Sequence, residues 1–72
     1  MNDIFKFIIE ANDGNAFCEY VENVWEIDPA LALKRFETAI KRHHYFYLKD
    51  SDRYINVNNI MSIKVEIVRK AD

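Results

Sequence analysis

The sequence has very little glycine, proline or cysteine, with one residue of each among 72. Half of the residues are apolar, so the composition is unlike that of a disordered or low-complexity segment. The lone Gly14 excludes the glycine-rich loops that bind phosphates and dinucleotides, because each of those loops needs at least two glycines. The sequence therefore predicts a folded chain without a nucleotide-binding loop, and its length fits a single domain over residues 1–72.

The single cysteine, Cys18, bears on the cellular compartment. Secreted domains of this size usually depend on disulfides, and one cysteine cannot form a disulfide within the chain. No apolar run is long enough to cross a bilayer, and the run near the N-terminus is interrupted by Lys6 and closed by Glu10, which is too short for a signal peptide. We therefore expect a cytoplasmic protein that does not enter a membrane.

Motifs for catalysis and for metal binding are also missing. The sequence contains no nucleophile elbow, no zinc-protease helix motif and no P-loop. The adjacent His43 and His44 would point about 100° apart on a helix, and no further ligands at metal-binding spacing accompany them. Cys18 is followed by Glu19, a setting that does not favour the reactive thiolate. We expect no enzymatic activity, no cofactor and no metal.

The clearest predicted element is a helix over residues 29 to 43. Asp28 is a good N-cap, and Pro29 suits the first helical position, where its missing N–H costs nothing. At 100° per residue, the apolar side chains fall on one face and the charged ones on the others. The apolar face comprises Ala32, Leu33, Phe36, Ala39 and Ile40.

The C-terminal third has the pattern of strands separated by turns. Two short runs, 44–49 and 54–57, flank the turn sequence DSDR at 50–53, and residues 60–68 alternate between apolar and polar side chains. Because a two-residue period is typical of a strand, we expect this last run to be a long closing strand.

Residues 16–27 allow two interpretations. The spacing of their polar residues is helical, whereas the sequence NDGN at 12–15 is a strong hairpin signal. A two-residue loop at Asp13 and Gly14 would pair Ile9 with Cys18, and the same register places Phe7 opposite Tyr20. The predicted fold is α+β: an antiparallel sheet of about four to five strands with one amphipathic helix packed on a face. Its order is β-β-α-β-β(-β), and the alternative is β-α-α-β-β(-β).

An apolar surface on the second face of the predicted hairpin indicates a protein-interaction module. Apolar patches of this kind usually mark interfaces, the simplest being that of a homodimer. The residues expected there are Ile4, Ile8, Phe17, Val21 and Trp25. The chain is short, acidic at one end and without catalytic motifs. In these respects it is similar to accessory proteins of bacteriophages and mobile elements of low-GC bacteria.

The alternative function is weak nucleic-acid binding. A basic stripe on the predicted helix would contact phosphates, and exposed tyrosines on the predicted sheet would stack on bases. The candidates are Lys34, Arg35, Lys41, Arg42, Tyr45, Tyr47 and Tyr54. The charge distribution weighs against this function, because residues 1–28 carry one lysine against seven acidic side chains, a net charge of −6.

Overall fold

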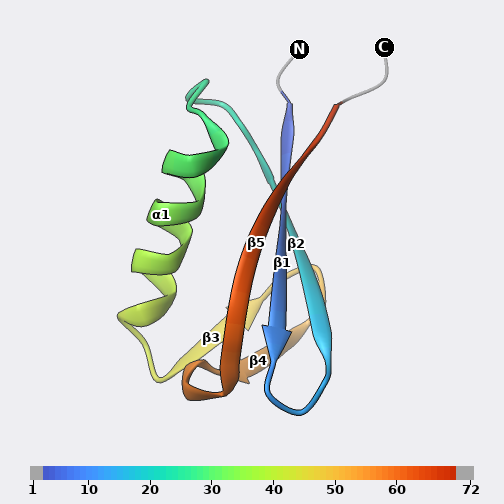
Figure 1. Ribbon diagram of the computed structural model, residues 1–72, viewed down its shortest axis with the longest axis vertical. Coiled ribbons are helices and arrows are strands. Elements are labelled where there is room, and N and C mark those ends of the chain that lie inside the picture. Colours follow the sequence, from blue (N-terminus) through green and yellow to red (C-terminus); the bar gives the residue numbers. More distant parts are fainter. Residues whose placement is uncertain (1–2, 70–72) are drawn as a thin grey trace.

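The computed structural model describes residues 3–69, and within them the chain forms five strands and one α-helix (Figure 1). The elements in chain order are β1 (Ile4–Ala11), β2 (Ala16–Glu22), α1 (Pro29–Lys41), β3 (Tyr45–Leu48), β4 (Arg53–Asn56), the short 3-10 helix η1 (Val57–Asn59) and β5 (Ile60–Val68). This order, β-β-α-β-β-β, is the predicted α+β fold. The alternative with a second helix before α1 is wrong, because residues 16–22 form a strand.

The strands divide between two antiparallel sheets rather than forming one. The larger sheet has the order β2-β1-β5, and β3 and β4 form a separate hairpin. The break lies at η1, where the Asn56 side chain accepts a hydrogen bond from the backbone N–H of Asn58 and ends β4. After this turn β5 runs antiparallel to β1, so that β1 lies between β2 and β5 (Figure 1).

The predicted register of the first hairpin is wrong by one residue. Ile9 pairs with Phe17, and Ile8 pairs with Cys18. The loop contains three residues, 12–14, because the Ala11 N–H donates to the Asn15 carbonyl at 2.9 Å. Gly14 closes this loop with φ of 90°, a left-handed conformation that glycine adopts without strain.

The register shift changes the predicted interface, because a slip of one residue exchanges the two faces of a strand. Phe17 and Val21 turn inward and pack against the core, whereas Ile4 and Ile8 lie on the outer face of the sheet. Trp25 lies beyond the end of β2. The five residues predicted to share one face therefore do not share it.

The core lies between the inner face of the larger sheet, α1 and the small hairpin. Phe36 joins its two halves: its ring stacks on Phe7 with centroids 4.1 Å apart and meets Phe46 edge-on at 6.1 Å. The helix begins as predicted, since the Asp28 carboxylate accepts from the Leu31 N–H at 2.8 Å. It ends at Lys41, two residues earlier than predicted, and Ala39 of the predicted apolar face is exposed.

Candidate interaction site

The described residues include no cluster of side chains that could form a metal centre. No group of three or more His, Cys, Asp or Glu side chains in residues 3–69 could hold a metal ion. His43 and His44 are both exposed, and Cys18 is a half-buried free thiol.

The outer edge of β2 is capped at its middle by the turn between β3 and β4. The backbone N–H of Tyr20 donates to the Asp50 carboxylate at 2.9 Å, and its carbonyl accepts from the Lys49 ammonium at 2.9 Å. The Asp50 N–H in turn donates to the buried carboxylate of Glu19 at 2.8 Å. The hydrogen bond from Tyr20, together with the one from Lys49, lowers the pKa of Asp50 below its usual value. The side chains of this turn thus take the place of a neighbouring strand at Tyr20.

The opposite edge of the sheet, along β5, has no such cap. The backbone N–H and C=O groups of successive residues in a strand point to opposite sides. Odd-numbered residues on the β1 side form backbone hydrogen bonds with β2, as in the bond from the Asn23 N–H to the Asp3 carbonyl. The even-numbered residues of β1 therefore form their backbone hydrogen bonds with β5. In β5 the N–H and C=O groups of Ile63, Val65 and Ile67 therefore point away from the sheet. No strand and no hydrogen bond of the described chain covers these groups.

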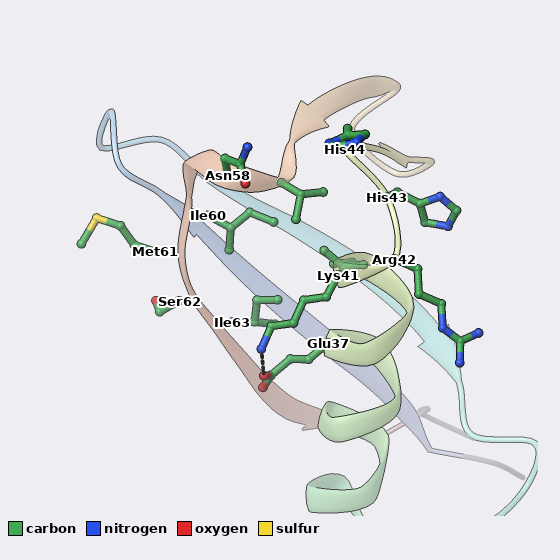
Figure 2. A pocket seen from close by; sticks show the side chains of 12 residues that line it. Glu37, Lys41, Arg42, His43, His44, Asn58, Ile60, Met61, Ser62 and Ile63 are labelled. Atoms are coloured by element: carbon green, nitrogen blue, oxygen red, sulfur yellow. Dashed lines mark ion pairs between the residues drawn. The ribbon is translucent and has the colours of Figure 1, made fainter.

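A groove of about 520 Å³ lies beside the beginning of this open edge, between β5 and the C-terminal half of α1 (Figure 2). Its apolar lining includes Ile40, Ile60 and Ile63. On the helix side, Lys41 and Glu37 form an ion pair at 3.7 Å, drawn as a dashed line in Figure 2. The groove therefore lies next to the outward backbone groups of Ile63.

The outer face of the larger sheet carries the remaining residues of the predicted interface. Ile4 and Ile8 are half-buried there, and the charged Glu10 and Lys64 beside them form an ion pair at 3.1 Å. Trp25, 67% exposed, lines a separate apolar pocket of about 240 Å³ between α1 and β2. The open edge of β5 was not predicted: the alternating run predicted the strand, but it does not show which edge of that strand stays open.

The basic residues of the predicted nucleic-acid site divide between two sides of the helix. Lys34 and Arg35 line a shallow groove on the exposed face, and Lys41 is paired with Glu37 on the β5 side. Arg42 lines both grooves. The structure brings some of the candidate residues together but does not gather all four basic side chains in one stripe.

The predicted tyrosines are exposed on the small hairpin. Tyr47 pairs with Tyr54 across the strands, with ring centroids 5.1 Å apart, and Tyr45 lies two residues before Tyr47. The Tyr47 hydroxyl donates a hydrogen bond to Asp52, which raises the pKa of Tyr47. The same turn carries two acidic and two basic side chains, and Lys49 forms an ion pair with Asp50 at 3.1 Å, so the tyrosines lie beside a turn without net charge.

No protein-family model, curated protein or solved structure matches this chain. Within residues 3–69, α1 is neither long enough nor apolar enough to cross a bilayer. A functional assignment therefore rests on the geometry of the two sheet edges and of the exposed faces.

Proposed function

We propose that this protein is a non-enzymatic, cytoplasmic interaction module that binds a partner by adding a strand to the free edge of β5. The difference between the two edges of the sheet supports the proposal. Side chains of Lys49 and Asp50 occupy the β2 edge at Tyr20, whereas the nine-residue β5 is open on one side.

Strand addition suits the chemistry of this edge. A long edge with unpaired N–H and C=O groups can pair with another extended chain, and proteins that do not use such an edge usually block it. Main-chain hydrogen bonds would supply affinity, and the groove along Ile40, Ile60 and Ile63 would select side chains of the added strand. The expected homodimer would use the same kind of pairing.

The cytoplasmic location is supported by the single free thiol of Cys18, because small secreted domains usually carry paired cysteines. An accessory role in a bacteriophage or mobile element stays a prediction from the sequence.

Peptide selection with proline variants tests strand addition. Peptides selected from a random library should slow amide exchange at Ile63, Val65 and Ile67 when they bind. Ile67→Pro should abolish binding, because it removes an outward N–H that the chain itself does not use. Cys18→Pro makes the same change at an outward position of the β2 edge and should leave binding intact. Peptides that still bind Ile67→Pro, or that protect other amides, would contradict the proposal.

Nucleic-acid binding is the second candidate, and the shared groove of Lys34, Arg35 and Arg42 favours it. The net charge of −6 over residues 1–28 and the ion pair of Lys41 with Glu37 weigh against it. A salt-dependent binding assay separates this function from strand addition, because phosphate contacts release counterions and lose affinity as salt rises.

A further inference from the structure

The charges along β5 are self-complementary in one register. Lys64 and Glu66 lie on the outer face of the sheet, on either side of Val65. If two β5 strands run antiparallel with Val65 opposite Val65, each Lys64 faces Glu66 of the second copy. Sliding the pair by two residues, the smallest shift that keeps the faces matched, places Lys64 opposite Lys64 or Glu66 opposite Glu66.

We infer that the strand added to β5 is β5 of a second copy, in the register that pairs Val65 with Val65. This inference rests on the proposed function, since it names the partner of the same edge. The outward N–H and C=O groups of Ile63, Val65 and Ile67 would then form about six hydrogen bonds, two for each facing pair. The two three-stranded sheets would become one continuous sheet.

The apolar side chains of β5 also fit this pairing. Ile63 faces Ile67 of the second copy on the inner face of the joined sheet, where aliphatic cross-strand neighbours stabilise each other. Ile67 is 45% exposed and Met61 is 71% exposed in the single copy. Pairing would cover part of this apolar surface, which removes it from water.

The state of the other edge explains why assembly would stop at two copies. Each copy offers β5 as an open edge, whereas Asp50 and Lys49 block the β2 edge at Tyr20. A two-fold pairing of β5 with β5 uses the open edge of the larger sheet in both copies and leaves no second open β5 edge for a third. The expected assembly is therefore a closed dimer rather than a filament.

Charge reversal tests this register by sedimentation equilibrium at equal protein concentrations. The unmodified protein should have twice the 8.6 kDa mass of one chain. Lys64→Glu and Glu66→Lys each place like charges opposite each other twice, so each variant should dimerise about tenfold more weakly or worse. An equimolar mixture of the two variants should recover the dimer. In the mixed pair, positions 64 and 66 are both acidic in one chain and both basic in the other, so opposite charges face each other again.

Glu10→Gln is the matched control. It removes the ion pair between Glu10 and Lys64 within one chain, which Lys64→Glu also loses, but it leaves the facing charges of β5 unchanged. This control should remain as dimeric as the unmodified protein.

Two outcomes would overturn the inference. The first is a single-chain mass at concentrations up to about 1 mM, where even weak pairing populates a dimer. If selected peptides still protect Ile63, Val65 and Ile67, strand addition survives and only the identity of the partner is wrong. The second is a dimer that neither reversal weakens, which would place the contact elsewhere.

Discussion

Replacing Phe36 by alanine should remove much of the stability of the fold, because this one ring connects both halves of the core. Deleting a fully buried phenylalanine side chain costs about 3–5 kcal/mol, and Phe36 is only partly buried. Its stacking on Phe7 at 4.1 Å and its edge contact with Phe46 add about 0.5–1.5 kcal/mol to the effect of burial. We therefore expect Phe36→Ala to lower the free energy of unfolding by about 3 kcal/mol.

Urea denaturation measures this loss directly. Small domains lose about 1 kcal/mol of stability per molar urea, so the midpoint should fall by about 3 M. Leu31→Ala, on the exposed side of the same helix, is the control and should cost less than about 1 kcal/mol. All samples need the same protein concentration, because dimerisation would stabilise the folded state. A midpoint for Phe36→Ala within about 0.5 M of the unmodified protein would refute the account of the core.

Three further predictions concern the turns and the basic helix. The pKa of Asp50 is lowered in the folded state, so its contribution to stability is present above about pH 4 and is lost as the pH falls through the folded pKa. The stability of Asp50→Asn should therefore fall less at acid pH than that of the unmodified protein, as measured by circular dichroism in an acid titration. Identical acid-unfolding curves for the two proteins would contradict this role of Asp50. Gly14→Ala should lower the free energy of unfolding by about 1 kcal/mol in calorimetry, because φ is 90° at this position. No atom lies within 4 Å of the added Cβ, so the cost comes from the backbone conformation alone. An unchanged melting temperature would show that the loop relaxes. Fluorescence anisotropy should show no binding to random DNA or RNA tighter than roughly 10 μM at physiological salt. Submicromolar binding that is lost on alanine substitution of the basic helix residues would instead favour nucleic acid as the ligand; these residues are Lys34, Arg35, Lys41 and Arg42.

The helix and the order of elements were predictable because they depend on local rules. Asp28 and Pro29 determine where α1 begins, and the two-residue period of 60–68 identifies β5. The register of β2 was not predictable in this way, since Gly14 fits both a two-residue and a three-residue loop. The observed register turns Phe17 inward, where it contacts a residue distant in the sequence: the guanidinium carbon of Arg53 lies 5.4 Å from the centroid of the Phe17 ring.

The candidate site depended even more on tertiary structure. The alternating run of β5 was visible in the sequence, but only the topology shows which of its edges is open. The cap on β2 joins Tyr20 to Asp50, which is thirty positions later in the chain. Neither residue has a pattern that would predict this contact, so the difference between the two edges could not be inferred before the fold was known.

Amide hydrogen exchange measured by NMR at several protein concentrations tests most directly whether β5 is the pairing edge. The account predicts that the amides of Ile63, Val65 and Ile67 exchange more slowly as the concentration rises. The amide of Cys18, outward on the β2 edge, is the reference and should exchange at a rate that does not depend on concentration. Fast exchange at Ile63, Val65 and Ile67 that does not change with concentration would contradict pairing between copies through β5.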